Sequence, residues 1–254
     1  MSKIITVCNQ KGGVGKTTTV INLASWLATK CLSILLIDLD PQANATSGLG
    51  FNKNELEKSV YQSLVDGISA SEIIKPTCVE WLDILPSKID LIGAEVELVN
   101  TFARETKLKN AIEEIKNCYD YIFVDCPPSL GLLTVNALTA ADSVLIPIQC
   151  EYYAMEGLTQ LMKTIHLVRQ ALNPKLELEG VLLTMYDSRV NLSNQVVAEV
   201  RKFFGNKVYN TVIPRNIRLA EAPSYGKPVF LYDRYSKGAE SYLSMTEEFL
   251  LRNK

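Results

Sequence analysis

The chain has 254 residues, of which 47% are apolar and 21% charged, so it can bury a substantial core without disulfide staples. Its six cysteines are scattered without C-x-x-C spacing, and no apolar run approaches the roughly 18 to 20 residues that span a bilayer. These features exclude a disulfide framework, a zinc site and a membrane-spanning helix, and the absence of a signal-peptide pattern predicts a cytoplasmic protein. The net charge of −2 argues neither for nor against a polyanionic partner.

Short apolar runs alternate with helical patterns along the chain. The predicted strands are Ile4–Cys8, Ile34–Asp38, Leu82–Leu85, Tyr121–Asp125, Val144–Ile148, Glu179–Thr184 and Val208–Ile213. They are rich in Ile, Val and Leu, as expected for strands buried on both faces of a parallel sheet. The predicted helices are Thr17–Thr29, Ala94–Lys116, Leu132–Ala140, Met155–Leu172, Leu192–Phe204 and Ala239–Leu250. The alternation predicts a single α/β domain over residues 1–254, with a doubly wound, mostly parallel sheet. The least periodic stretch, Gly48–Thr77, is interpreted as an insertion at the edge of the domain.

The first predicted strand runs through a glycine-rich turn into a helix, which is the setting of a P-loop. The turn consists of Lys11, Gly12, Gly13, Val14, Gly15, Lys16, Thr17 and Thr18. Glycines let backbone N–H groups surround phosphate oxygens, and the N-terminus of the helix adds a positive dipole end. Lys16 can reach the β- and γ-phosphates, and the hydroxyl of Thr17 can ligate Mg²⁺. An empty turn is the alternative, but Gly-Lys-Thr in this position favours a nucleotide triphosphate site.

Two further predicted strands end in carboxylates. Asp38 and Asp40 stand at and just beyond the end of one buried strand, where open α/β sheets bind ligands. Asp125 ends the strand Tyr121–Asp125 in a Walker B pattern and is placed to hold Mg²⁺ through water. A structural role for Asp38, as a cap for loop N–H groups, stays open.

The phosphate loop departs from the standard pattern, because Gln10 occupies the position of its first glycine and Lys11 adds a second lysine. Lys11-Gly-Gly-Val-Gly-Lys-Thr-Thr18 resembles the deviant Walker A motif of the ParA/MinD superfamily of ATPases. That resemblance implies a P-loop NTPase fold with ATP and Mg²⁺ as cofactors. It also implies that Lys11 reaches the nucleotide of a second copy in an ATP-dependent sandwich dimer. A shared cation would offset the repulsion between two apposed triphosphates.

The resemblance extends over nearly the whole chain and is strongest to the chromosomal ParA (Soj)-type partition ATPases. It rests on Pro127–Thr134, Pro147–Tyr153, Val212–Arg218 and Glu221–Pro228. It implies a weak intrinsic ATP hydrolase in which Asp40 orients the attacking water, Asp38 supports the outer shell of the metal, and Pro214 and Asn216 lie against the adenine. The family usually has glycine where this chain has Ala43.

The charge distribution is uneven, with 15 basic and 21 acidic residues up to residue 180, and 11 basic and 7 acidic residues after it. Random surface variation explains these counts alone, but the resemblance implies that the ATP-bound homodimer binds double-stranded DNA non-specifically through this region. Arg189 matches a family position of that kind, and Arg218 is the next candidate. Arg201, Lys202 and Lys207 could extend the patch, although solubility explains them better. A ParB-type centromere-binding protein is the implied stimulator, and chromosome or plasmid segregation on the nucleoid is the implied role.

Three other functions belong to the same fold. A MinD-like membrane-cycling ATPase for division-site positioning is the main alternative, but it needs an amphipathic C-terminal helix with a basic face. Ser241–Lys254 carries Glu247 and Glu248 and is better explained as a helix that docks on the fold, so no stable membrane association is expected. Cysteine spacing disfavours an iron–sulfur electron carrier, and the long ParA-like stretches disfavour an amide ligase.

Overall fold

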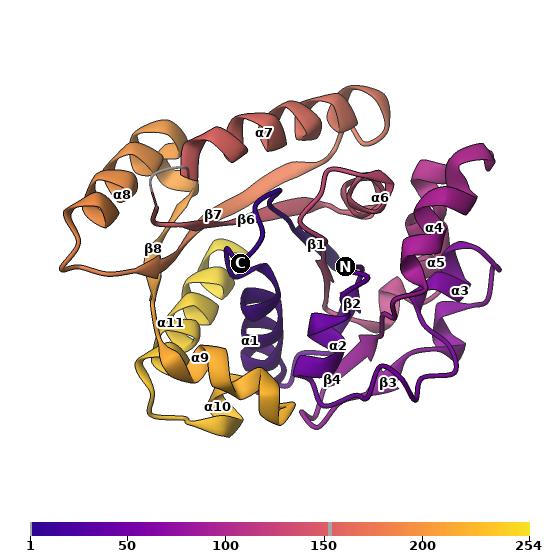
Figure 1. Ribbon diagram of the computed structural model, residues 1–254, viewed down its shortest axis with the longest axis horizontal. Coiled ribbons are helices and arrows are strands. Elements are labelled where there is room, and N and C mark those ends of the chain that lie inside the picture. Colours follow the sequence, from indigo (N-terminus) through magenta and orange to yellow (C-terminus); the bar gives the residue numbers. More distant parts are fainter. Residues whose placement is uncertain (1, 152–153) are drawn as a thin grey trace.

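The computed structural model describes residues 2–151 and 154–254, and its eight strands form one sheet in the order β3-β4-β2-β5-β1-β6-β7-β8 (Figure 1). Adjacent strands pair in parallel except for β3 and β4, which are antiparallel. The predicted doubly wound, mostly parallel sheet is therefore confirmed. Tyr152 and Tyr153, which end one of the stretches that carry the resemblance, lie outside the described residues.

All seven predicted strands are present, three of them with the predicted bounds. The observed strands are β1 Lys3–Val7, β2 Ile34–Asp38, β3 Lys75–Pro76, β4 Leu82–Leu85, β5 Tyr121–Asp125, β6 Ser143–Gln149, β7 Glu177–Tyr186 and β8 Val208–Pro214. The short edge strand β3 was not predicted, because its exposed Lys-Pro sequence carries no apolar run. Its antiparallel pairing with β4 places part of the stretch Gly48–Thr77 at the edge of the sheet, as predicted.

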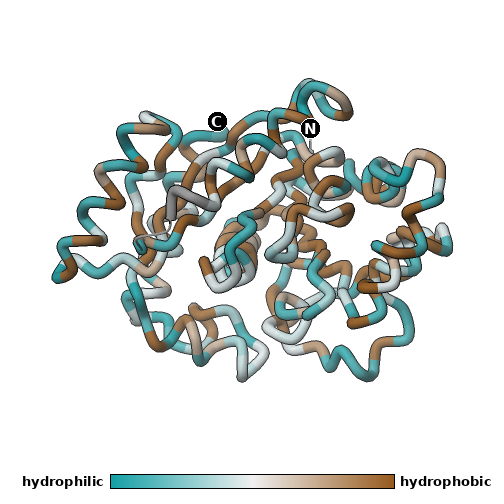
Figure 2. The backbone as a smooth tube through the Cα atoms, turned by 45° about the horizontal axis from the view of Figure 1, so that its top comes forward, coloured by the Kyte–Doolittle hydropathy of each residue, from teal (hydrophilic) through white to brown (hydrophobic). Residues whose placement is uncertain are grey.

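The helices cover both faces of the sheet (Figure 1). Their bounds are α1 Lys16–Ala28, α2 Asn44–Gly48, α3 Val60–Leu64, α4 Leu91–Glu97, α5 Lys107–Ile112, α6 Leu132–Ala140, α7 Ala154–Ala171, α8 Asn191–Phe204, α9 Ile217–Glu221, α10 Val229–Tyr232 and α11 Lys237–Arg252. Successive strand residues point to opposite faces, so each strand contributes to two apolar clusters. Leu36 and Phe123 pack with α1 and α11, whereas Leu35 and Val124 pack under α4 to α8. Figure 2 shows the apolar residues concentrated along the central strands.

The single long helix predicted over Ala94–Lys116 is wrong. The chain instead forms α4, a 3₁₀ turn at Leu98–Asn100, a second at Arg104–Thr106, and then α5. The helix breaks where Ala103 adopts a left-handed conformation with φ of 52°. That conformation cannot continue a right-handed helix, and no glycine or proline in this stretch marks the break in the sequence.

The stretch Gly48–Thr77 also contributes more to the core than an edge insertion would. Val60, Leu64, Ala70 and Ile73 are buried in the cluster beneath α4 and α5. Ser59 and Gln62 form a capping box that starts α3.

No helix among the described residues is long and apolar enough to cross a membrane.

Candidate nucleotide and magnesium site

The parallel register brings the predicted site residues to one edge of the sheet. Val7 of β1 and Asp38 of β2 are both register partners of Asp125 in β5. The phosphate loop that follows β1 therefore emerges beside both aspartates. This is the carboxyl edge of the sheet, where doubly wound folds bind ligands.

The phosphate loop has the backbone that its glycines allow. Gly13 and Gly15 adopt φ values of 74° and 88°, a region that side chains disfavour. The hydroxyl of Thr184 in β7 donates to the carbonyl of Val14 at 2.8 Å and so fixes the loop from outside. α1 begins directly after Gly15 with no side-chain cap, which leaves the first N–H groups of the helix available to an anion.

Lys16 lies inside the loop rather than in solvent. Its ammonium donates to the carbonyl oxygen of Lys11 at 3.1 Å, and its side chain is buried. Burial lowers the pKa of Lys16, and the charge of Asp125 acts in the opposite direction. The lysine is thus held at the loop by weak neutral contacts that a phosphate could replace with charged ones.

Asp125 has one carboxylate oxygen bound and one free of any protein partner in the described chain. Its Oδ2 accepts a 2.7 Å hydrogen bond from the hydroxyl of Thr17, whereas Oδ1 is buried without a partner. Burial and the nearby charge of Asp38 raise the pKa of Asp125 well above its usual range. A buried, unpaired carboxylate oxygen beside a threonine hydroxyl fits a divalent cation with oxygen ligands. Thr17 and Asp125 are therefore the residues that would hold Mg²⁺.

Asp38 is occupied by its own loop. It accepts hydrogen bonds from the backbone N–H and hydroxyl of Thr46, at 2.8 and 2.7 Å, and from the N–H of Asp40 at 3.2 Å. Burial raises the pKa of Asp38 to about 6, although these hydrogen bonds favour the ionised form. Asp38 therefore positions the segment from Asp40 to Thr46, in line with the capping role that the sequence left open. An outer-shell role toward the metal stays a prediction.

Asp40 faces the cavity from the segment that Asp38 positions. The cavity measures about 430 Å³, and the loop glycines, Lys16, Thr17, Thr18 and Asp40 all line it. The N–H of Gln42 donates to Asp40 at 2.9 Å, which fixes the carboxylate. Ala43 next to it has φ of 54°, a left-handed conformation in which glycine would be unstrained. The sequence position where the family usually has glycine is thus a strained backbone position in this chain.

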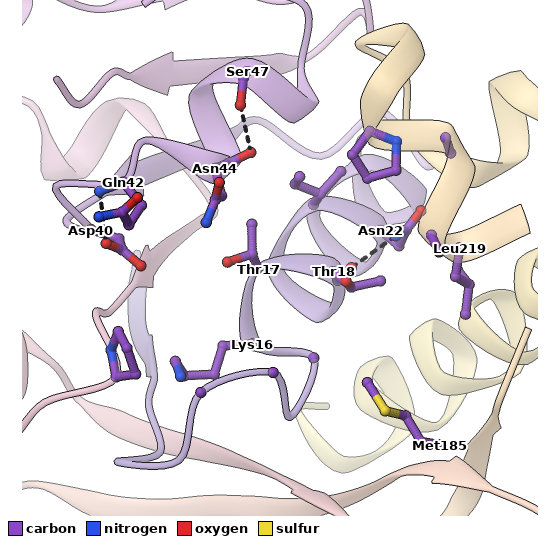
Figure 3. Close-up of a pocket in the computed structure, with 18 of the residues that line it drawn as sticks. Lys16, Thr17, Thr18, Asn22, Asp40, Gln42, Asn44, Ser47, Met185 and Leu219 are labelled. Carbon is purple, nitrogen blue, oxygen red and sulfur yellow. Dashed lines mark hydrogen bonds between the residues drawn. The ribbon is translucent and has the colours of Figure 1, made fainter. Parts of the chain in front are cut away.

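Several lining residues were not singled out from the sequence. Gln42, Asn44 and Ser47 line the cavity beside Asp40, and Met185 lines it from the end of β7 (Figure 3). The polar residues after Asp40-Pro41 were a usable signal, because they continue a segment already assigned to the site. Met185 gave none, since it looks like an ordinary apolar residue at a strand end.

Pro214 and Asn216, predicted to contact the adenine, line a hollow of about 170 Å³ next to the phosphate cavity. Gly15, Thr18 and Met185 line both spaces, so the two adjoin at the start of α1. The side chain of Asn216 accepts from the N–H of Arg218 at 3.0 Å and caps α9. The structure therefore brings the predicted base contacts next to the phosphate loop.

Lys11 differs from Lys16 in where its side chain goes. It lines a separate open hollow with Gln10, Pro128, Ser129, Leu130, Gly157 and Gln160. Its ammonium lies 3.3 Å from the carboxylate of Glu151, which Arg215 also approaches at 3.5 Å. Of the two lysines in the loop, only Lys16 belongs to the phosphate cavity of its own chain. Glu151 is a further charged residue of this region that sequence reasoning left without a role.

The two arginines predicted to contact DNA are each paired with nearby carboxylates. Arg189 is strongly exposed and bonds both oxygens of Asp187, at 2.9 and 2.7 Å. Arg218 pairs with Glu221 at 2.8 Å and with Asp233 at 3.2 Å. Both side chains are on the surface as predicted, but neither presents an unpaired charge in this conformation.

Comparisons with known proteins place this chain in a family. Residues 2–178 match a family model described as an AAA domain. The sporulation initiation inhibitor protein Soj of Bacillus subtilis is 60% identical over 98% of both chains. The chromosome partitioning protein ParA of Myxococcus xanthus is 54% identical over 100% of this chain and 89% of its own.

Solved structures agree with this assignment. Cobyrinic acid a,c-diamide synthase of Mycobacterium smegmatis, with bound ADP and magnesium, is 38% identical with a TM-score of 0.87, covering 100% of this chain and 95% of that one. The septum site-determining protein MinD of Pyrococcus horikoshii, complexed with Mg-ADP, is 26% identical with a TM-score of 0.80, covering 98% and 96%. On its P-loop, its carboxylates and these full-length similarities, the chain belongs to the ParA/MinD superfamily of deviant Walker A P-loop ATPases, together with the chromosomal ParA and Soj partition proteins.

Proposed function

We propose that this chain is a partition ATPase. Two copies pair around ATP and Mg²⁺, the pair holds double-stranded DNA without sequence preference, and a ParB-type partner stimulates hydrolysis to drive chromosome or plasmid segregation. The observation that carries the proposal is the different placement of the loop's two lysines. Lys16 lines the phosphate cavity of its own chain, whereas Lys11 lines a separate open hollow and pairs with Glu151.

The chemistry of hydrolysis follows from the residues of the cavity. The loop N–H groups and Lys16, which line the cavity, would bind the phosphates. Thr17 and Asp125, joined by a hydrogen bond, would hold the magnesium ion. When bound, the ion neutralises charge that develops on the transferred phosphoryl group. Asp40, fixed by the N–H of Gln42, accepts a hydrogen bond from the attacking water and orients it. Asp38 holds the backbone of this segment in place through Thr46.

Pairing of two copies follows from Lys11. Its ammonium is half-exposed and is neutralised by Glu151 in the single chain. An exposed ion pair of this kind is worth little, so a triphosphate presented by a second copy can compete for the lysine. The exchange makes the pair of copies depend on ATP rather than on ADP, which lacks the γ-phosphate.

DNA binding and nucleoid association are inferred from the family and from the exposed arginines. Contacts from Arg189 and Arg218 to phosphates would carry no sequence information and would weaken with salt. A cytoplasmic, nucleoid-associated protein is the consistent location. The relatives named Soj and ParA, at 60% and 54% identity, favour this role over the amide-ligase activity in the name of the 38% identical synthase.

The C-terminal helix supports partition over a membrane-cycling function. In α11 the apolar residues Ala239, Tyr242, Met245 and Phe249 are buried against the core. Glu248 accepts hydrogen bonds from the N–H groups of Asn210 and Thr211 and ties the helix to β8. A helix whose apolar face is already used in packing has none left for a lipid surface.

The deciding experiment is ATP hydrolysis by the purified chain alone, with duplex DNA, with the ParB-type protein of the same genome, and with both. We expect a weak basal rate and strong stimulation only when both are present. Stimulation by anionic lipid vesicles instead would support the membrane-cycling function. Glutamine-dependent ATP use with amide formation would support the ligase and contradict the proposal.

A further inference from the structure

The segment from Ile89 to Phe102 exposes a stripe of large apolar side chains. Ile89, Ile92, Val96, Val99 and Phe102 are 62%, 52%, 72%, 50% and 94% exposed, and they are five of the fifteen exposed large apolar side chains among the described residues. We call these five residues the α4 stripe. Ile92, Val96 and Val99 are spaced four and three residues apart, which places them on one side of α4 and the 3₁₀ turn that follows it.

The fold does not need the α4 stripe for its own packing. The opposite side of the same segment supplies Leu91, Ala94 and Leu98 to the core, and all three are buried. A surface helix usually carries one apolar side and one polar side. A second apolar side that stays in solvent is a feature of interaction surfaces.

The charges around the α4 stripe identify the kind of partner. Every charged residue between Ile89 and Phe102 is acidic, namely Asp90, Glu95 and Glu97. Lys88 pairs with Asp90, and Arg104 pairs with Glu105, so the net negative charge of residues 88–105 comes from Glu95 and Glu97. An apolar stripe with acidic borders complements a short amphipathic segment with basic residues, and it opposes nucleic acid or an anionic membrane.

Glu95 connects the α4 stripe to the nucleotide site. The carboxylate of Glu95 lies against Gly131, where a Cβ atom on the glycine would collide with Oε1 of Glu95. Gly131 precedes the first turn of α6 and has no side chain to cap it, and Glu95 Oε1 is buried without a hydrogen-bond partner among the residues that the structure describes. The loop from Asp125 to Gly131 also contributes Pro128 to the phosphate cavity. A shift of α4 would therefore displace the loop that starts at Asp125, the residue that would hold magnesium.

We propose that the α4 stripe is the docking surface for a basic amphipathic segment of the partner that stimulates hydrolysis. When the partner is bound there, Glu95 transmits the change to the loop from Asp125 to Gly131. The inference rests on the proposed function, since it assigns a site to the stimulating partner. Glu95 is a positioning residue here, because it touches neither nucleotide nor metal.

The test uses the full chain and the purified ParB-type protein of the same genome. Val96→Glu places a charge in the middle of the α4 stripe, on a side chain that is 72% exposed, so folding is preserved. The matched control is Leu251→Glu, at an apolar residue of α11 that is 65% exposed. We expect Val96→Glu to weaken partner binding about tenfold or more and to lose stimulation, because a buried unpaired charge costs at least that much in an interface. Basal hydrolysis and ATP-dependent DNA binding stay as in wild type, and the control behaves as wild type throughout.

A second variant separates docking from its transmission. Glu95→Gln keeps the shape of the side chain and removes its charge from the start of α6, so we expect a smaller stimulation than in wild type when the partner is present at saturating concentration. If Glu95→Gln is stimulated as strongly as wild type, the transmission step is wrong.

Other outcomes would overturn the docking surface. Equal partner affinity of wild type and Val96→Glu would place the partner elsewhere and leave the proposed function intact. Loss of ATP-dependent pairing by Val96→Glu in light scattering would make the stripe a contact between two copies. A wild-type chain that neither binds the partner nor responds to it would contradict the proposed function itself and this surface with it.

Discussion

The phosphate cavity and the arginines of the C-terminal third differ in how their charges are held. At the phosphate site, Lys16, Asp38 and Asp125 are buried. Lys16 and Asp38 are fixed by hydrogen bonds within their own loops, and Asp125 is fixed by the hydroxyl of Thr17. Arg189 and Arg218 are exposed and are paired with carboxylates close to them in sequence or in space. The first region is organised before any ligand arrives, whereas the second must exchange partners to bind an anion.

The difference predicts unequal consequences of mutation. Removing a buried, preorganised group leaves a cavity or an unpaired charge, and its effect on chemistry is large. Removing a cation that stays exposed in the complex changes affinity by a modest and salt-dependent factor, because solvent and a local carboxylate already screen it. Four changes test this ordering, from the largest effect to the smallest.

Asp40→Ala should reduce partner-stimulated hydrolysis by a factor on the order of 10³, the scale of losing a group that orients or deprotonates the nucleophile. Nucleotide binding should persist, because Lys16 and the loop glycines that line the cavity remain. The variant should therefore accumulate as the ATP-bound pair, measured by single-turnover hydrolysis and light scattering. Asp66→Ala, at an exposed aspartate away from the cavity, is the control. Normal turnover by Asp40→Ala would remove this residue from the mechanism.

Lys11→Ala should weaken ATP-dependent pairing by about 100-fold or more. Each copy would lose one charge-assisted contact to the other's phosphates, each worth about 1.5 to 3 kcal/mol. Its affinity for ATP as a single chain should change little, since Lys11 lies outside the cavity of its own chain. Equilibrium sedimentation with ATP, beside nucleotide titration, measures the two effects separately. Lys30→Ala is the exposed control, and an ATP-dependent pair formed by Lys11→Ala at wild-type concentration would rule out the proposed role.

Asp38→Asn should alter how stability without nucleotide depends on pH. Burial raises the pKa of Asp38 from 3.8 to about 6, so the folded state holds this proton more tightly than the unfolded state does. The stability that this tighter proton binding gives the folded state is fully present below about pH 4 and is lost as the pH rises through about 6. As the pH rises from 4.5 to 7.5, the free energy of unfolding of the variant should therefore increase relative to that of wild type by on the order of 1 to 3 kcal/mol.

Urea denaturation in chelator at the two pH values measures the gain of Asp38→Asn, with Asp66→Asn as the matched control. Parallel pH profiles of Asp38→Asn and wild type would contradict burial of an ionisable carboxylate at this position.

Arg189→Ala should have the smallest effect, a several-fold loss of DNA affinity. The slope of log affinity against log salt concentration should decrease by about one for each lost phosphate contact. The loss is limited because Arg189 must leave Asp187 before it reaches a phosphate. Fluorescence anisotropy with duplex DNA at two or more salt concentrations provides both numbers. Lys207→Ala, an exposed cation for which solubility is the preferred explanation, should match wild type. An unchanged salt slope in Arg189→Ala would place the DNA surface elsewhere.

Much of the fold was predictable because its strands are short, apolar and buried on both faces. β2, β4 and β5 begin and end at the predicted residues. The prediction failed over Ala94–Lys116, where apolar periodicity continues across a backbone break at Ala103 that no glycine or proline announces. It also missed β3, since an exposed Lys-Pro pair becomes a strand only by pairing with β4.

The site divides in the same way. Gly13, Gly15, Lys16 and Thr17 were identifiable because a strand, a glycine turn and a helix follow one another in the sequence. Asp125 was identifiable because it ends an apolar strand in a Walker B pattern. Met185 and Glu151 were not, because each joins the site only through the arrangement of β6, β7 and the phosphate loop.

The sequence by itself determined the phosphate loop, the two carboxylate-ended strands and the family, because these depend on residue type and short spacing. The tertiary structure alone decided which way each charge faces. Strand order set Asp125 beside Asp38 and left one buried oxygen unpaired. Chain packing sent Lys16 inward and Lys11 outward, and it left the α4 stripe in solvent while its other side filled the core. The reason is physical: local spacing fixes which groups are present, whereas burial and long-range pairing fix the charge that each presents.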